Sequence, residues 1–225
     1  MYKEVAFVGH VGGANELTVS LARLLSAEPV ITTQSDNIGL WALDTLPEKY
    51  DWALEVLPKG NTTPVSDEQR NSWLNQAIAL FVDRKPTALL LECPVEGGEY
   101  LIETLPSHVD LYQDVASIPV DKYSLVIAVT PWIHAYPALC IQYVPKVLHV
   151  GMGCKRDLLV DVQLLKEKIL TSLREQHLSE KAICSLDSVD IKADEKALLL
   201  LAEALHVPFY TYPATELKEI EVSTP

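Results

Sequence analysis

The chain has 225 residues and carries 31 acidic against 18 basic side chains, a formal net charge of −13. This excess of negative charge argues against nucleic acid or an anionic membrane surface as a partner, because both are bound mainly through Lys and Arg. No apolar run approaches the roughly 20 residues of a membrane span, and the first residues lack the pattern of a signal peptide. We therefore expect a cytoplasmic protein whose 4 cysteines are reduced thiols.

Short apolar runs alternate with segments of helical periodicity along the whole chain. The predicted strands cover residues 5–9, 29–33, 88–92, 124–130, 147–151, 183–189 and 208–212, and the predicted helices cover residues 15–26, 67–82, 158–176 and 193–205. This alternation predicts the α/β class, here two or three small α/β domains with mostly parallel sheets. In the helix over 67–82, Asp67 is the expected N-cap, and Trp73, Ala77, Leu80 and Phe81 share one face.

A boundary between domains is expected at Val144–Lys146. It follows a stretch that contains Pro131, Pro137 and Pro145, and residues 146–225 have a smaller excess of acidic side chains than the preceding part. We expect a cleft where the domains on either side meet. Both ends of the chain run into elements that stop abruptly, which favours a piece of a longer protein or a minimal version of one.

The first segment that could carry chemistry is a Gly-rich turn between a predicted strand and a predicted helix. Its sequence from residue 9 to residue 16 is Gly-His-Val-Gly-Gly-Ala-Asn-Glu. Free N–H groups at a helix start suit a carboxylate or a phosphate, so Gly12, Gly13 and Asn15 are candidate binding residues. His10 and Glu16 are candidate catalytic groups, because both side chains can exchange protons. The spacing is neither GxGxxG nor a P-loop, and a plain tight turn in which His10 caps the loop is the alternative.

A second Gly-rich turn follows the predicted strand over 147–151. Gly151 and Gly153 again precede a helix, and Lys155 and Arg156 place two adjacent cations beside them. This combination is a candidate anion site, with solvated surface charge as the alternative for the two cations. Cys154 is expected to be a small buried residue rather than a reactive thiol.

The third segment runs from residue 185 to residue 195, where a predicted strand ends and a helix begins. Acidic side chains are favoured in a first helical turn, which accounts for Asp194 and Glu195 without any function. Lys192 opposes the helix dipole, so we expect it to face a bound anion or an acid such as Asp190. Asp190, Lys192 and Glu195 are therefore candidates for the edge of a charged pocket.

Weaker candidates lie in the middle of the chain. Residues 93–98 form a ligand-binding loop or only a turn, and Trp132, His134 and Tyr136 form an aromatic platform or ordinary packing. The other histidines show no metal-ligand spacing, so we expect no metal site.

Taken together, three segments resemble one family. GHVGGANEL with EPVITT, then KVLHVGMGCKR, then SLDSVDIKADEKALLLLAEALHVPF resemble the CbiG family of anaerobic cobalamin biosynthesis, described as cobalt-precorrin-5A hydrolases. The resemblance implies that residues 1–45 are the end of the family's N-terminal domain and that residues 46–145 are its variable middle domain. Residues 146–225 then form an incomplete C-terminal domain, which also resembles the stand-alone CobE protein of the aerobic route.

The resemblance implies a reaction on a cobalt-containing, ring-contracted tetrapyrrole. Hydrolysis opens a δ-lactone, and a two-carbon unit leaves as acetaldehyde. Carried onto the matched segments, His10, Glu16 and Lys192 become the candidate catalytic residues. The carboxylates of the substrate would be bound by nine residues of the same segments: Gly12, Gly13, Asn15, Gly151, Gly153, Lys155, Arg156, Asp190 and Glu195. No cofactor is expected, because cobalt enters as part of the substrate macrocycle.

Two other functions stay open at this point. A tetrapyrrole-binding or carrier module without catalysis is compatible with the likeness to CobE. A nucleotide-binding α/β domain is disfavoured, because GxGxxG and GK[ST] are both absent. The expected partner is the cobalt-tetrapyrrole substrate, with other enzymes of the corrin pathway and a second copy of the chain as further candidates.

Overall fold

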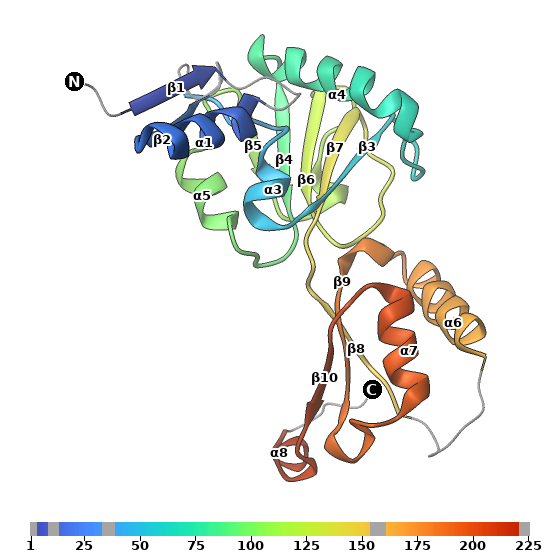
Figure 1. The fold of residues 1–225 in the computed structure, drawn as a ribbon. Helices are drawn as coiled ribbons and strands as arrows, with labels where there is room; N and C mark the ends of the chain where they lie inside the picture. Colours follow the sequence, from blue (N-terminus) through green and yellow to red (C-terminus); the bar gives the residue numbers. More distant parts are fainter. Residues whose placement is uncertain (1–3, 9–13, 33–38, 154–160, 221–225) are drawn as a thin grey trace.

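Three sheets follow one another along the chain (Figure 1). The structure is a computed structural model, and it describes residues 4–8, 14–32, 39–153 and 161–220. The sheets have two, five and three strands, and all strand pairs except one are parallel. This arrangement confirms the α/β class with mostly parallel sheets. Among the described residues, no helix is long and apolar enough to cross a membrane.

The N-terminal part is a single strand–helix–strand unit. Strands β1 (Glu4–Val8) and β2 (Glu28–Thr32) pair in parallel, and helix α1 (Ala14–Leu25) connects them. The described helix starts directly after the predicted Gly-rich turn. His10, Gly12 and Gly13 lie outside the described residues.

The central domain is built on a five-stranded sheet with strand order β3-β7-β6-β4-β5. Its strands are β3 (Ala53–Leu57), β4 (Thr87–Leu91), β5 (Val109–Tyr112), β6 (Leu125–Val129) and β7 (Leu139–Val144). Only β3 runs antiparallel to its neighbour. All residues of β6 and β7 are buried, as expected for parallel strands covered on both faces.

Helices and loops cover the two faces of this sheet differently. The helices of the central domain are α3 (Leu46–Tyr50), α4 (Asp67–Val82) and α5 (Gly98–Glu103). Phe81 of α4 and Leu101 of α5 pack with Leu89 and Ile127 on one face. On the other face, Ala88, Leu90 and Val126 pack with Ile118 and Tyr136, which come from connections between strands. The short 3-10 helix η1 (Val115–Ser117) lies in one of these connections.

The C-terminal domain has a three-stranded parallel sheet with strand order β10-β9-β8. Its elements are β8 (Leu148–Gly151), α6 (Val162–Glu175), η2 (Glu180–Ala182), β9 (Ile183–Val189), η3 (Asp190–Lys192), α7 (Lys196–Leu205), β10 (Phe209–Tyr212) and α8 (Ala214–Glu219). Figure 1 shows α6 and α7 together on one side of this sheet. Leu186 of β9 packs there against Leu198 and Leu201. Because side chains alternate along a strand, Ser185 and Asp187 lie on the opposite face.

Several predicted boundaries are wrong. Helix α4 has Ser66 as its N-cap, not Asp67. Helix α6 begins at Val162, because the Asp161 carboxylate accepts the N–H groups of Gln163 and Leu164 and so caps the helix there. Helix α7 begins at Lys196, after the predicted start at 193, because residues 190–192 form a 3-10 turn first.

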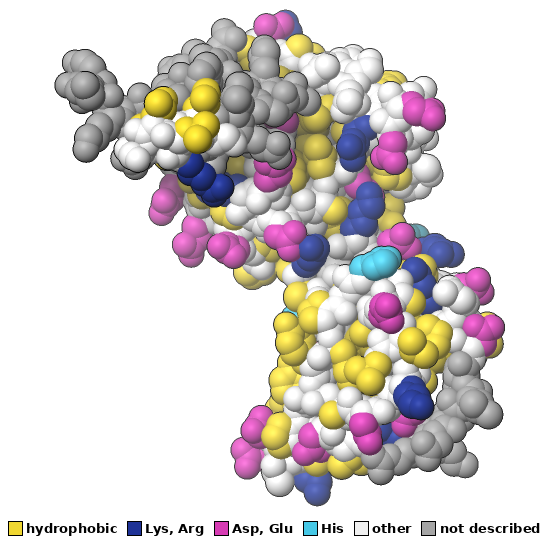
Figure 2. Space-filling view, in the orientation of Figure 1, with side chains coloured by type: hydrophobic (Ala, Val, Ile, Leu, Met, Phe, Trp, Pro, Cys, Tyr) yellow, Lys and Arg dark blue, Asp and Glu magenta, His cyan; other side chains and the backbone are white. Residues whose placement is uncertain are grey.

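The central and C-terminal domains are joined by backbone pairing as well as by the chain itself. Trp132 and Leu178 form an isolated antiparallel bridge. Beside it, Ser179 N donates to Pro131 O at 2.8 Å, and Ile133 N donates to His177 O at 2.7 Å. The Lys181 ammonium also lies 2.9 Å from a carboxylate oxygen of Glu55 on β3. Figure 2 shows the molecule narrowing where these domains meet, with charged side chains gathered at the waist.

Candidate functional site

A cavity of about 550 Å³ lies at the carboxyl ends of the three C-terminal strands. Gly151 and Gly153 line it from the end of β8, Asp187 from β9 and Tyr212 from β10. In open α/β sheets, ligands bind outside the carboxyl ends of the parallel strands. The cavity therefore brings together the second and third predicted segments at the place where a ligand is expected.

Four polar side chains form a connected cluster beside this cavity, and three of them line it: His149, Asp187 and Tyr212. Ser185 Oγ donates to Asp187 Oδ2 at 2.5 Å. The Nδ1 atom of His149 lies 2.6 Å from Ser185 Oγ and 3.5 Å from Asp187 Oδ2. The Tyr212 hydroxyl donates to Asp187 Oδ1 at 3.3 Å. The cluster thus links one side chain from β8, two from β9 and one from β10.

Burial changes steadily through this cluster. Ser185 is fully buried, and the Asp187 side chain is 13% exposed. The His149 side chain is 60% exposed and lines the cavity. Desolvation and the neighbouring Asp187 charge raise the pKa of the Tyr212 hydroxyl, so this group stays protonated at neutral pH and donates a hydrogen bond. The arrangement can orient an imidazole at the surface of the cavity by means of a largely buried carboxylate.

The Gly-rich turn after β8 is tied to β9. Met152 N donates to Asp187 O at 2.8 Å, and Ser188 Oγ donates to Met152 O at 2.7 Å. These two bonds place Gly151 and Gly153 beside the polar cluster. Lys155 and Arg156, the cations predicted next to this turn, lie outside the described residues.

The third segment is arranged differently from the expectation. The Lys192 side chain is buried, and its ammonium lies 3.7 Å from a carboxylate oxygen of Glu195. Lys192 therefore faces an acid, as expected, but this acid is Glu195 rather than Asp190. The Asp190 carboxylate is exposed and accepts a hydrogen bond from Ile191 N. Glu195 is the N-cap residue of α7 and Asp194 precedes it, so neither lies within the first helical turn.

The first segment is described only where the helix begins. Asn15 and Glu16 occupy the first turn of α1, as the sequence predicts. The candidate catalytic role of His10 and the binding roles of Gly12 and Gly13 stay predictions, since these residues lie outside the described part.

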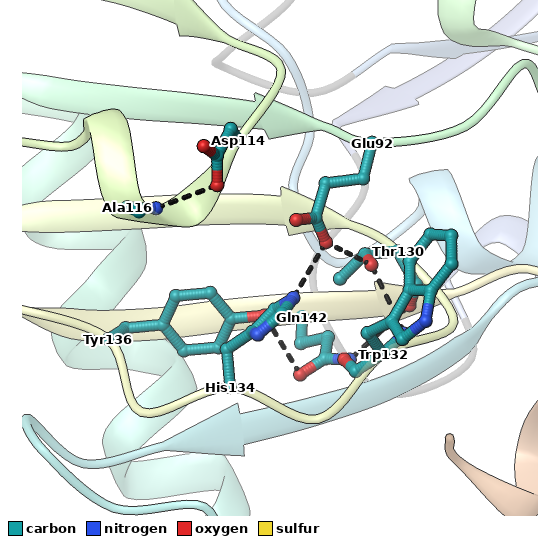
Figure 3. A network of polar contacts seen from close by, with 8 residues as sticks. All are labelled: Glu92, Asp114, Ala116, Thr130, Trp132, His134, Tyr136 and Gln142. Carbon is teal, nitrogen blue, oxygen red and sulfur yellow. Dashed lines mark hydrogen bonds and ion pairs between the residues drawn. The ribbon is translucent and has the colours of Figure 1, made fainter. Parts of the chain in front are cut away.

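A second polar network lies at the carboxyl ends of the central strands β4 and β6 (Figure 3). Glu92 Oε2 accepts hydrogen bonds from Thr130 Oγ1 at 2.5 Å and from His134 Nε2 at 2.8 Å. Burial alone would raise the pKa of the Glu92 carboxyl group, but the bonds from His134 and Thr130 outweigh it and hold this pKa below its ordinary value. Gln142 Nε2 of β7 donates to Trp132 O at 2.8 Å and so holds the loop that follows β6.

This network fixes the loop that docks the C-terminal domain. Pro131, Trp132 and Ile133 make the pairing with residues 177–179, and the network lies on both sides of them in sequence. Tyr136 is buried in the core, whereas Trp132 is 37% exposed. The aromatic residues of this loop therefore serve packing and the docking of the C-terminal domain. Of the two alternatives that the sequence left open, an aromatic platform or ordinary packing, this arrangement favours packing.

The cleft expected between these domains is present as a cavity of about 740 Å³. Tyr50 and Trp52 line it from the central domain, and Lys181 and His206 line it from the C-terminal domain. The 93–98 segment contributes Pro94, Val95 and Glu96 to its wall. Gly97 of this segment has a structural reason, since its φ is 87° and a Cβ there would lie 2.7 Å from the Tyr50 ring.

Three family models match the chain in order. "Cobalamin synthesis G N-terminal" matches residues 5–36, "Cobalamin biosynthesis central region" matches residues 41–145, and "Cobalamin synthesis G C-terminus" matches residues 148–225.

The chain belongs to the CbiG family.

Curated members of the CbiG family are similar over nearly the whole chain. The cobalt-precorrin-5A hydrolase of Salmonella typhimurium is 31% identical over 220 residues, which cover 95% of this chain and 56% of that protein. The cobalt-precorrin-5A hydrolase of Priestia megaterium is 28% identical over 223 residues, which cover 96% of this chain and 55% of that protein. The chain thus spans about half the length of the curated relatives it matches.

One solved structure is also similar. It is the crystal structure of a cobalamin biosynthesis protein G homolog from Sulfolobus solfataricus, with 16% identity and a TM-score of 0.32, and the match covers 99% of this chain and 58% of that one.

The polar cluster and its cavity lie in the part that matches the CbiG C-terminus. None of His149, Ser185, Asp187 and Tyr212 was predicted as a site residue, although Ser185 and Asp187 lie within the third segment. The alternation within each strand indicates that His149 faces away from Val150 and that Asp187 faces away from Leu186. The pairing of β8 with β9, which brings these two faces together, comes from the fold.

Proposed function

We propose that this protein acts in cobalamin biosynthesis as a cobalt-precorrin-5A hydrolase. The proposed reaction opens the δ-lactone of the cobalt-containing tetrapyrrole with water and releases acetaldehyde. The observation that carries the proposal is the cavity at the carboxyl ends of β8, β9 and β10, where two motif segments of a CbiG family member meet. The similarity to two proteins named cobalt-precorrin-5A hydrolase supports it.

The substrate carries several carboxylates, whereas the protein has a formal net charge of −13. Local groups outweigh this repulsion, because charges farther than about 8 Å are screened at physiological salt. We assign the peripheral carboxylates to backbone N–H groups around Gly151 and Gly153 and to Lys155 and Arg156. Cobalt is part of the substrate in this proposal, and the reaction takes place in the cytoplasm.

The first Gly-rich turn has a complementary role in the proposal. Gly12, Gly13 and Asn15 bind a further carboxylate or the oxyanion, and His10 and Glu16 exchange protons with the substrate. Lys192 holds the turn before α7 through its buried pair with Glu195, beside the exposed Asp190.

Two measurements test the proposal on this chain. The first is a titration with cobyrinic acid or cobalt-precorrin-5A followed by absorbance, and the second is acetaldehyde release from cobalt-precorrin-5A. We expect micromolar binding and turnover, and we expect the R156A and K155A variants to bind at least several-fold more weakly. Binding without acetaldehyde release would support the carrier module instead, and no binding would contradict both functions.

A further inference from the structure

The polar cluster of the C-terminal domain determines which nitrogen of His149 carries a proton. The Ser185 hydroxyl has one proton, which it donates to Asp187 Oδ2. The 2.6 Å contact between Ser185 Oγ and His149 Nδ1 is then a bond that Nδ1–H donates. A neutral imidazole held in this way has its lone pair on Nε2, which is therefore the proton acceptor.

The surroundings of His149 suit an imidazole that becomes charged for part of a reaction. Asp187 faces it from β9 with a carboxylate oxygen 3.5 Å from Nδ1, so an opposite charge lies beside the ring when it takes up a proton. Tyr212 from β10 faces the other oxygen of the same carboxylate and donates to it. Because Ser185 is buried and His149 is exposed to the cavity, the polar chain ends at the imidazole.

We propose that His149 is the general base that activates water for lactone opening, with Asp187, Ser185 and Tyr212 as positioning residues. This inference rests on the proposed function. The water proton passes to Nε2 while the water oxygen bonds to the lactone carbonyl carbon. The bond between that carbon and the ring oxygen then breaks, and the released alkoxide takes the proton back from Nε2. The products are a carboxylic acid and an alcohol, and His149 returns to its neutral form.

The assignment separates the two chemical steps. His149 serves the hydrolysis, which precedes the cleavage that releases acetaldehyde. A variant without His149 should therefore leave the lactone closed.

The test is single-turnover analysis of H149Q and the wild-type chain with cobalt-precorrin-5A, resolved by mass spectrometry. We expect lactone opening to slow by about 100-fold or more, while corrinoid affinity stays within twofold of the wild type. The rising limb of kcat/KM with pH, which reports a base losing its proton, should disappear in H149Q. S185A and D187N should slow the step by about tenfold, the effect of losing one hydrogen bond to the imidazole or its partner.

Matched controls are available on the same domain. H177N changes a histidine at the end of α6 that is exposed and has φ of 55°, a conformation that Asn tolerates. Y210F changes the tyrosine that neighbours Tyr212 on β10 and is 50% exposed. Both should retain wild-type rates, whereas Y212F should not. Long-range proton–nitrogen spectra should show Nδ1–H in the wild type and a mixture of tautomers in D187N.

The outcomes distinguish this inference from the proposed function. Wild-type rates and an unchanged pH profile in H149Q, with an active parent, overturn the role of His149 and leave the hydrolase function standing. A parent chain that binds the corrinoid but never opens the lactone overturns both. A neutral wild-type His149 protonated at Nε2 contradicts the geometry on which the inference rests.

Discussion

At the scale of single residues, the two polar clusters differ in what they leave accessible. Glu92 is held by His134 and Thr130 inside the central domain, and its loop is used for docking. Asp187 is held by Ser185 and Tyr212, and its remaining neighbour His149 lies in a cavity. Both clusters combine a carboxylate, a hydroxyl group and a histidine, so residue types alone do not distinguish them. The exposure of the histidine does, because the His134 side chain is 22% exposed and the His149 side chain is 60% exposed.

The Glu92 network makes stability depend on pH. A carboxyl group whose pKa is lowered on folding stabilises the protein above its unfolded pKa, and this stability is lost as pH falls through the folded value. E92Q should lower the free energy of unfolding by about 1.5–3 kcal/mol at pH 7 and flatten its loss in acid. Urea unfolding followed by tryptophan fluorescence reports this domain, because all 4 tryptophans lie between residues 41 and 132. E96Q, at an exposed glutamate nearby, is the matched control, and an equal effect of the two variants would contradict the argument.

At the scale of elements, the continuous apolar strands of the central sheet were predictable and its mixed strands were not. β4 and β6 are continuous apolar runs, and both were found from the sequence. β3, β5 and β7 were missed, because β3 and β5 contain acidic side chains and β7 contains Gln142. Sequence periodicity contains no information about long-range partners, and each of these strands is defined by its pairing within the sheet.

Gln142 shows why a polar residue stands in the middle of a buried strand. Its amide nitrogen donates to Thr130 O and Trp132 O, and its amide oxygen accepts from the Tyr136 hydroxyl. Q142L should therefore cost about 1–3 kcal/mol of unfolding free energy, because it leaves buried groups without partners. Q76L, on the exposed side of α4, should change stability by less than about 0.5 kcal/mol in the same urea titration. An unfolding free energy that is unchanged or raised in Q142L would contradict this argument, because the carbonyl groups of Thr130 and Trp132 would then have found other hydrogen-bond donors.

At the scale of the whole molecule, the central and C-terminal sheets are arranged in series. The cavity between them is lined by Pro145 after β7 and by Val147, Ile183 and Pro208 at the starts of the C-terminal strands. The carboxyl edge of the central sheet therefore faces the amino edge of the next sheet (Figure 1). The second carboxyl edge, with its polar cluster, opens at the far end of the C-terminal domain. Sequence analysis predicted the cleft between the two domains. Which edge of each sheet faces the cleft depends on strand pairings that only the folded chain shows.

Docking of the two domains should depend on the pair between Lys181 and Glu55. The Glu55 side chain is 12% exposed, so K181E places a second carboxylate beside one that is largely removed from water. We expect thermolysin, which cleaves before apolar residues, to cut the segment at 145–147 about two- to fivefold faster in K181E, as a loss of about 0.5–1 kcal/mol of docking predicts.

The double variant E55K/K181E should recover part of the protection, because it restores opposite charges. K59E breaks an exposed pair with Asp121 inside the central domain and should leave the cleavage rate unchanged. If K181E and K59E are cleaved at the same rate, backbone pairing at Trp132 and Leu178 holds the domains without help from this ion pair.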